Sequence, residues 1–572
     1  MQSRTLSWGP PASRLAVKKA FRSRSFERPA GVRLQRRDEL MPGGDDESVA
    51  PLRPARHGLL VGFVVLFFTM AALRRAWMCD DAFIMMRSVD NLVAGRGFVF
   101  NADERVLGFT NPLWALVVAA VYSVLKDPYL TPVLLGLVVS AAAATLLAVH
   151  GAKDKRVVAL VLVVLCFSRA FVDFSTSGLE NSLSHFLLIA FFLTALRPTG
   201  AWLVKLSAIG ALVSVTRPDL AVLVAPTLIA VYVRMRRAGA LKAMLVGSLP
   251  ALLWYAFALV YYGFPLPNTV YAKLNASIPK RELAQQGLAY LVDTVINDPL
   301  TAIVIVGALA LLVVQRHRDK AAIVILLSMI LDLAHVVMIG GDFMSGRFLT
   351  PSVAVSAVVL SHYGAQLLND SQRLRWAAAG AAVLVLSVAF SPFRDDPAHE
   401  KKEIPKNRIA NERAWYQDEL SLLVNLRPVA WREDGFFADG RLARDRHQKV
   451  TVAGNLGIYS WGAGPEVHVV DSQALTDPLL ARIPYAYSAD WRPGHLGRDV
   501  PPGYLDTLEQ GKNLLKDRCL AGYYDRLNHI IRGPLFSAER WKAILDLNLP
   551  GGVTVRKCPA PVEPEFASIA HR

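Results

Sequence analysis

Charged side chains are scarce in this chain. Asp, Glu, Lys and Arg make up 19% of its 572 residues, hydrophobic residues make up 53%, and the mean hydropathy is +0.32. A soluble chain of this length would divide into several domains and carry more charge. The composition therefore excludes an ordinary soluble protein and favours a membrane protein with many spans, because each spanning helix needs about 20 mostly apolar residues.

Cysteine is also rare, with four residues in the chain. Cys79 and Cys166 lie in or beside apolar segments, whereas Cys519 and Cys558 lie in the C-terminal region, where they can form a disulfide if that region is exported. No CxxC motif or His spacing accompanies them, which argues against a metal site. We expect no certain cofactor, although a group of acids at one membrane face would suit a divalent cation.

Acidic residues are outnumbered by basic ones, which gives a formal net charge of +16. Many Lys and Arg stand in short clusters between apolar segments, such as RMRR at 234–237 and RHR at 316–318. Such clusters are typical of the cytoplasmic loops of membrane proteins. Because no DNA- or RNA-binding motif accompanies the charge, we expect the partner to be a lipid bilayer and no nucleic acid.

Hydropathy divides the chain into three regions. Residues 1–56 are basic and broken by Pro and Gly, which predicts a disordered cytoplasmic tail. Residues 57–392 form a transmembrane part that starts with an apolar run at 58–73. No small-residue cleavage site follows this run, so we expect a retained helix and a first outer loop at 74–111.

The third region, residues 393–572, is less apolar and is expected to be a soluble α/β-type domain of ordinary size. It contains the runs VTVAGNLGIYSW and EVHVVD, which have the length of strands, and a helical pattern near 503–516.

Apolar segments after the first helix predict the remaining membrane crossings. They lie at 112–125, 130–149, 156–172, 183–199, 202–215, 219–233, 244–262, 298–315, 321–341, 351–369 and 376–390. The short segment at 112–125 is expected to be re-entrant or interfacial, which leaves about 11 spans. The basic clusters then face the cytoplasm, and the odd number of spans places the C-terminal domain outside the cytoplasmic membrane.

Two adjacent acids, Asp80 and Asp81, stand in the stretch WMCDDAFIMMR just beyond the first apolar helix. A carboxylate partly desolvated beside a membrane has a raised pKa, which suits a catalytic base. Consecutive helical residues point about 100° apart, so the two acids should not share one role. They could also be ordinary interfacial charges. Arg87 follows at helical spacing, which favours a functional segment, and we place it among the substrate-binding residues.

Further polar residues stand at outward ends of other apolar segments. Glu180 and the Arg217–Asp219 pair could bind substrate, or they could be helix-start residues. Arg347 follows Asp342 by a few residues, and its guanidinium suits a phosphate because it binds oxyanions in a bidentate manner. A salt bridge between Arg347 and Asp342 is the alternative, and both can hold together.

Three more positions are candidates with plain alternatives. Lys273 follows two prolines and can serve a phosphate, or it is a solvated loop charge. His495, in the stretch WRPGHLGR, either lines the site or has a structural role. Asp332 and His335 share one face of a predicted span, where ionisable groups are functional or form a mutually satisfied pair.

Several stretches together resemble the GT-C fold of polyprenyl-phosphate-dependent glycosyltransferases, most closely the terminal β-(1→2) arabinofuranosyltransferases of actinobacterial cell walls. The similarity covers most of 58–392 and, more weakly, the C-terminal domain. The stretches are WMCDDAFIMMRSVDNLVAGRGFVFNADERV (77–106), TNPLW (110–114), SGLEN (177–181), RPD (217–219), PLPNTVYAK (265–273) and GGDFMSGRFLTP (340–351).

The resemblance implies an inverting membrane glycosyltransferase with an aspartate of the first outer loop, Asp80 or Asp81, as base. The donor would be a polyprenyl-phosphate sugar, with arabinofuranose as the candidate sugar, and the acceptor a cell-envelope glycan or lipid-linked acceptor on the outer face of the cytoplasmic membrane. Two other classes compete: a transporter or flippase of a lipid-linked glycan, and a non-catalytic glycan-binding membrane protein. No internal repeat supports a transporter, and the unusual residues gather at one face.

Overall fold

The structure is a computed structural model. It describes residues 54–198, 201–235, 238–367, 404–423 and 430–549, and the single residues 382, 393, 402, 554, 555 and 558. The predicted tail lies outside these residues except for its last positions, where helix α1 (Pro54–Arg74) already begins.

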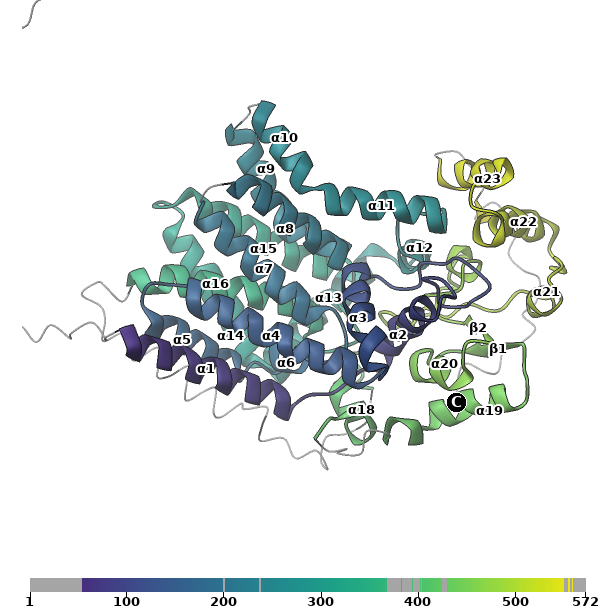
Figure 1. Cartoon of the computed structure of the whole chain (residues 1–572), viewed down its shortest axis with the longest axis horizontal. Coiled ribbons are helices and arrows are strands. Elements are labelled where there is room, and N and C mark those ends of the chain that lie inside the picture. The colour runs from purple at the N-terminus through teal and green to yellow at the C-terminus, as the bar shows by residue number, and fades with distance from the viewer. Residues whose placement is uncertain are drawn as a thin grey trace, which may run out of the picture. The chain divides into compact units, whose positions relative to one another are not determined.

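Apolar helices from the first two thirds of the chain pack around a common core (Figure 1). Helix α7 contacts α4, α8 and α16, and α16 in turn contacts α14. Phe191, Phe192 and Val355 are fully buried at these contacts. The helices are α1, α4 (Leu130–His150), α5 (Lys155–Leu165), α7 (Asn181–Leu196), α8 (Trp202–Thr216), α9 (Ala221–Met235), α14 (Pro299–Gln315), α15 (Lys320–Met338) and α16 (Thr350–Leu367).

Several described helices are long and apolar enough to cross a membrane, so the helical membrane fold is confirmed. Four such spans are 130–150, 218–235, 320–338 and 347–366, and two bent helix pairs raise the number to six. Shorter apolar helices occur at 58–74, 112–125, 181–196 and 202–216. The number of about 11 spans stays a prediction, and the expected segment at 376–390 falls outside the described residues apart from residue 382.

Two of the predicted segments are broken. The one at 156–172 divides into α5 and α6 (Arg169–Asp173), because Ser168 caps α6 by accepting a hydrogen bond from Phe171 N at 3.3 Å. The one at 244–262 divides into α10 (Ala238–Gly247) and α11 (Leu249–Tyr262), which meet at an angle of 54°. The second residue of α11 is a proline, which supplies no backbone N–H and so favours a helix start.

Helix α13 (Lys280–Asn297) does not appear among the predicted apolar segments, because its polar residues lower the mean hydropathy of this stretch. It turns by 109° into α14 at Asp298, whose carboxylate caps α14 by accepting a hydrogen bond from Thr301 N at 3.3 Å. Leu288, Val292 and Ile296 are exposed on one face of α13, at helical spacing. An exposed apolar face on a helix bent away from a span is typical of a helix that lies along a membrane surface.

The C-terminal part combines a small sheet with helices, and its standing as a separate soluble domain stays a prediction. Strand β1 (Val450–Ala453) pairs in parallel with β2 (His468–Asp471), and helix α20 (Gly457–Ala463) lies between them in the chain. The remaining helices are α18 (Glu412–Leu420), α19 (Gly435–Asp445), α21 (Tyr504–Gln510), α22 (Arg518–Arg532) and α23 (Ala538–Asn548). Cys519 and Cys558 form the expected disulfide.

Two details of this part differ from expectation. Only the first four residues of the run VTVAGNLGIYSW are a strand, and its last five belong to α20. Parallel strands need a crossover connection, and α20 supplies it. The helical pattern near 503–516 ends earlier, since α21 stops at Gln510 and Gly511 adopts a positive φ of 65° as its C-cap.

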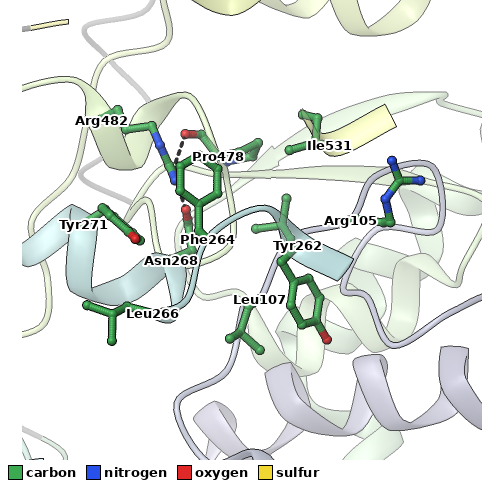
Figure 2. A pocket seen from close by; sticks show the side chains of 11 residues that line it. Arg105, Leu107, Tyr262, Phe264, Leu266, Asn268, Tyr271, Pro478, Arg482 and Ile531 are labelled. Atoms are coloured by element: carbon green, nitrogen blue, oxygen red, sulfur yellow. Dashed lines mark hydrogen bonds between the residues drawn. The ribbon is translucent and has the colours of Figure 1, made fainter. Parts of the chain in front are cut away.

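The PLPN stretch holds the C-terminal part in place (Figure 2). The Asn268 side chain donates to the main-chain carbonyls of Ala474, Leu475 and Asp477 at 2.9–3.3 Å, and its carbonyl accepts from Arg482 at 2.7 Å. The Arg482 guanidinium lies 4.2 Å from the ring centre of Phe264. The cavity beside them measures only about 10 Å³, so the protein fills this junction itself.

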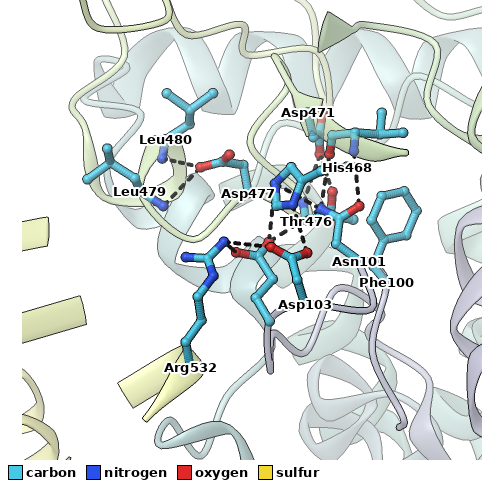
Figure 3. Close-up of polar contacts among 12 residues, drawn as sticks. Phe100, Asn101, Asp103, His468, Asp471, Thr476, Asp477, Leu479, Leu480 and Arg532 are labelled. Carbon is cyan, nitrogen blue, oxygen red and sulfur yellow. Dashed lines mark hydrogen bonds and ion pairs between the residues drawn. The ribbon is translucent and has the colours of Figure 1, made fainter. Parts of the chain in front are cut away.

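A second junction joins the first outer loop to β2 and α22 (Figure 3). Asp103 lies 2.8 Å from His468 Nδ1 and 3.0 Å from Arg532, and Glu104 lies 2.9 Å from Arg532. Burial lowers the pKa of His468, but Glu104 and Asp103 outweigh it and raise the pKa above its usual value. Asn101 adds two hydrogen bonds with the backbone of Val469. The loop is thereby fixed beside the sheet.

Candidate functional site

Asp80 and Asp81 open helix α2 (Asp80–Val93), and the structure separates them. The Asp80 carboxylate accepts hydrogen bonds from the backbone N–H groups of Gly457 at 3.0 Å and Ile458 at 2.7 Å, at the start of α20. Burial raises the pKa of Asp80 to about 7, and the two N–H groups oppose this rise. Both oxygens of Asp80 are therefore occupied by the C-terminal part.

Asp81 points elsewhere. Its side chain is 32% exposed, and its carboxylate lies 4.0 Å from the Arg347 guanidinium. Burial raises the pKa of Asp81, and the charge of Arg347 lowers it in part. Asp81 is thus an accessible carboxylate beside the Arg347 guanidinium, and it makes no hydrogen bond within the described part of the chain.

Arg347 stands at the start of the short 3-10 helix η2 (Arg347–Leu349), between α15 and α16. Its guanidinium lies 3.5 Å from Glu180 and 3.5 Å from Asp342, in addition to Asp81. Its buried Nε atom has no hydrogen-bond partner among the described residues. A buried N–H group without a partner costs stability, so this atom is a donor available to a bound oxyanion.

Glu180 is the centre of a second set of contacts. Its carboxylate accepts from Arg217 at 3.2 Å and from Asn111 at 2.8 Å. Arg217 in turn forms a bidentate pair with Asp219 at 2.5 and 3.0 Å. Burial raises the pKa of Glu180, but Arg217 and Arg347 outweigh it and hold the pKa below its usual value.

Lys273 lies at the last turn of α12 (Asn268–Leu274) and faces the same cluster. Burial lowers its pKa, while Asp342 and Asp219 act to raise it and Arg217 and Arg347 to lower it. No ion pair or hydrogen bond of its ammonium group occurs among the residues that the structure describes. Lys273 is exposed as a residue, so the neighbouring protein desolvates its ammonium group only in part.

The sequence-based candidates therefore fall into two groups. Arg87 lies apart from the cluster: it donates to the main-chain carbonyls of Phe100, Ser460 and Val467 and ties α2 to the C-terminal part. The residues brought together are Asp81, Glu180, Arg217, Asp219, Lys273, Asp342 and Arg347. We call these seven residues the charged cluster.

His495 lies at the rim of the charged cluster. Its ring meets that of Phe343 edge-on at 4.5 Å, next to Asp342. Burial lowers the pKa of His495 to about 4, and the nearby Arg492 acts in the same direction. The ring is therefore neutral at physiological pH.

Two neighbours of the charged cluster were missed by sequence reasoning. Glu412, the first residue of α18, pairs with Arg492 at 3.8 Å. Burial and then the charge of Asp81 raise the pKa of Glu412 to about 8, so it lies close to the candidate base. Arg492 stands in the stretch WRPGHLGR, the same stretch that made His495 a candidate. No motif marks Glu412.

Asp332 inside α15 accepts a hydrogen bond from Ser352 of α16 at 2.7 Å, a contact between helices that neither of the two alternatives for Asp332 and His335 included. No group of three or more His, Cys, Asp or Glu side chains suited to a metal ion occurs in the described ranges.

The chain thus combines apolar helices with a charged cluster that lies where several of these helices end. This arrangement defines a membrane-embedded protein.

No model of a known protein family matches the chain. The terminal beta-(1->2)-arabinofuranosyltransferase of Corynebacterium glutamicum is 28% identical over 332 residues, which cover 50% of this chain and 47% of that one. The enzyme of the same name from Mycobacterium tuberculosis is 27% identical over 569 residues, which cover 78% of this chain and 87% of that one.

The chain thus spans about half the length of the first relative and most of the second. The predicted resemblance to glycosyltransferases, and to arabinofuranosyltransferases in particular, is confirmed by both. Among solved structures, ArnT from Cupriavidus metallidurans bound to undecaprenyl phosphate has a TM-score of 0.44 and 12% identity, covering 72% of this chain and 75% of that one.

Proposed function

We propose that this chain is a membrane glycosyltransferase of the GT-C type that transfers an arabinofuranose unit from a polyprenyl-phosphate donor. The acceptor is a glycan or lipid-linked acceptor of the cell envelope, on the outer face of the cytoplasmic membrane. The observation that carries the proposal is the pairing of an accessible acid, Asp81, with Arg347, whose buried Nε–H group has no hydrogen-bond partner among the described residues.

The reaction we propose is a single displacement with inversion. The acceptor hydroxyl oxygen attacks the anomeric carbon of the donor, and the bond between this carbon and the phosphate oxygen breaks. The bonding electron pair leaves with the lipid phosphate, and the hydroxyl proton moves to Asp81. A base with a raised pKa takes this proton more readily than an ordinary aspartate would.

The cations of the charged cluster have a role in the same step. Negative charge builds up on the lipid phosphate as it leaves, and Arg347 and Lys273 are placed to stabilise it. Arg217 is fully engaged by Asp219 and Glu180, so we assign it the role of positioning Glu180. Asp80 is likewise a positioning residue, since it holds α20 against α2.

The orientation in the membrane is part of the proposal. The basic clusters at 234–237 and 316–318 face the cytoplasm, and the charged cluster faces the other side. The C-terminal part then lies outside the cytoplasmic membrane, which agrees with its disulfide, because disulfides persist in oxidising compartments.

The test uses the purified full-length chain in detergent with a radiolabelled polyprenyl-phosphate arabinofuranose and a synthetic arabinofuranose oligosaccharide. We expect label transfer, with the product in the anomeric configuration opposite to that of the donor. Asp81→Asn should lower the rate about 10²–10⁴-fold, which is the usual contribution of a general base.

The matched control is Asp90→Asn on the same helix, where Asp90 pairs with Arg96 at 2.6 Å away from the charged cluster. It should transfer at the wild-type rate. A wild-type rate in Asp81→Asn would overturn the base assignment. Movement of the lipid-linked sugar across proteoliposome membranes without transfer would instead support the transporter alternative.

A further inference from the structure

A cavity of about 170 Å³ adjoins the charged cluster. Ser345 and Gly346, which immediately precede Arg347, form part of its lining, and so does Glu412. At about 30 Å³ per water molecule, the cavity has room for about six waters, which is the scale of one sugar ring. The cavity and the charged cluster thus share the 342–347 loop, and α18 contributes to the cavity alone.

The lining of this cavity is polar and rich in carboxylates. Asp293 accepts hydrogen bonds from Asn297 at 2.8 Å, Asn407 at 3.0 Å and Ser345 at 2.6 Å, so this wall is held in a fixed position. Asp173 and Asp298 add further acids, and Trp77 and Phe174 add two aromatic faces. Fixed acceptors beside aromatic rings suit a neutral polyhydroxylated ligand.

The charges of the lining disfavour an anion or an acyl chain as the ligand. Asp173 is paired with Arg75 at 2.5 Å and lies 4.0 and 3.9 Å from the two lining cations, Arg169 and Arg413. An anion would still meet repulsion from the carboxylates of Asp293 and Asp298, and an acyl chain could not bond to the polar groups of the lining. Hydroxyl groups are donors, and carboxylates accept from them.

Glu412 is the least engaged acid of the lining. Its carboxyl group lies 3.8 Å from the Arg492 guanidinium and makes no hydrogen bond among the described residues. Burial and Asp81 raise its pKa to about 8, which favours the protonated form, and that form can donate to a hydroxyl as well as accept from one. Because Asp81 contributes to that shift, a ligand beside Glu412 is also near the proposed base.

Within the described part of the chain, the cavity opens beside two exposed residues of its lining, Asn297 at the end of α13 and Pro405 ahead of α18. Trp77 and Ala170 are buried in its interior. A ligand can therefore enter at the open end, while the inner end is enclosed by protein.

We propose that this cavity is the subsite for one neutral sugar unit of the acceptor glycan, and that it directs a hydroxyl of that glycan past Glu412 towards Asp81. This assignment rests on the function proposed above and adds the place and chemistry of acceptor binding to it. Glu412 is then a substrate-binding residue, and Asp293 and Ser345 position the wall.

The test measures binding of a synthetic arabinofuranose oligosaccharide to the full-length chain in detergent, by microscale thermophoresis. Pro405→Trp and Asn297→Trp place a large ring at the open end of the cavity, and we expect each to weaken binding by about tenfold or more. Lys406→Trp and Gln285→Trp add the same ring at exposed positions outside the lining and should bind as the wild type does.

A second measurement separates this proposal from the catalytic one. Hydrolysis of the labelled donor by water needs no acceptor, so both cavity variants should keep the wild-type hydrolysis rate while the KM for the oligosaccharide rises. Loss of binding in the cavity variants without any donor turnover in the wild type would support the subsite and contradict the glycosyltransferase. Unchanged binding in both cavity variants, or no binding to the wild type, would overturn the subsite.

Discussion

Asp80 and Asp81 are neighbours in the chain, yet they make different contacts. The helical rotation of about 100° per residue directs Asp80 to the backbone of α20 and Asp81 to Arg347. A carboxylate that accepts two backbone N–H groups is a poor candidate for a proton acceptor, because its lone pairs are already in use. The difference between the two acids follows from geometry alone.

The pH dependence of transfer should report on Asp81. Its base form is the carboxylate, so kcat/KM rises with pH through its raised pKa. Arg347 holds this pKa down in part, so Arg347→Gln should move the acidic limb of the profile to higher pH. The rate should also fall about 10²–10³-fold, as for loss of an oxyanion donor.

Arg96→Gln is the control for this change, because Arg96 pairs with Asp90 outside the charged cluster. Its pH profile should match that of the wild type. An acidic limb that stays in place in Arg347→Gln would contradict the electrostatic coupling of Arg347 to Asp81.

Much of the charged cluster could be predicted from the sequence, because Glu180, Asp219, Asp342 and Arg347 stand in short polar stretches at the ends of apolar runs. Such polar stretches contrast with the apolar runs beside them, so they can be recognised in the sequence. Glu412 lies in a polar region, where one more acid carries no signal, and only the fold shows that it approaches Asp81.

At the scale of elements, the close approach of α20 to α2 depends on a glycine. A Cβ atom on Gly457 would stand 1.9 Å from the carbonyl oxygen of Asp80, and that atom is backbone. Gly457→Ala should therefore separate the two helices at a cost of about 1–3 kcal/mol, as for other overpacked sites. Hydrogen exchange of the α20 amides, followed by mass spectrometry, should show lower protection.

Gly454→Ala is the matched control three residues earlier, where the nearest heavy atom to the added Cβ is 3.5 Å away. Its exchange should equal that of the wild type. Equal protection of α20 in Gly457→Ala and the wild type would show that the contact tolerates a methyl group.

The sequence predicts where the apolar runs lie better than it predicts whether each run forms a helix or a strand. The run VTVAGNLGIYSW has the composition of a strand throughout, yet its second half is helical because it crosses between two parallel strands. Helix α13 was not predicted, because only one of its faces is apolar and its mean hydropathy is therefore low. In both cases local composition allows more than one type of element, and tertiary packing determines which type forms.

At the scale of the whole molecule, the disulfide between Cys519 and Cys558 closes a loop with a sequence separation of 39 residues. Loop-closure entropy for such a length corresponds to about 3–4 kcal/mol. Treatment with dithiothreitol should therefore lower the thermal stability of the α22–α23 region. The double variant Cys519→Ser/Cys558→Ser should show this lower stability from the start and should not respond to the reductant.

A thiol count provides the direct check. The non-reduced, denatured chain should contain two reactive thiols, from Cys79 and Cys166. Four reactive thiols in the purified protein would contradict the disulfide and, with it, one argument for an oxidising compartment.

The contact between Asp80 and α20 joins residues that lie 377 positions apart. During synthesis, α2 is made long before its partner exists, and the Asp80 carboxylate has no backbone to bind until α20 has been translated. Because chains fold in the order in which their parts appear, this contact forms only after all seven residues of the charged cluster have been made. A nascent or prematurely terminated chain would thus hold those residues without the contact that fixes the start of α2 beside Asp81.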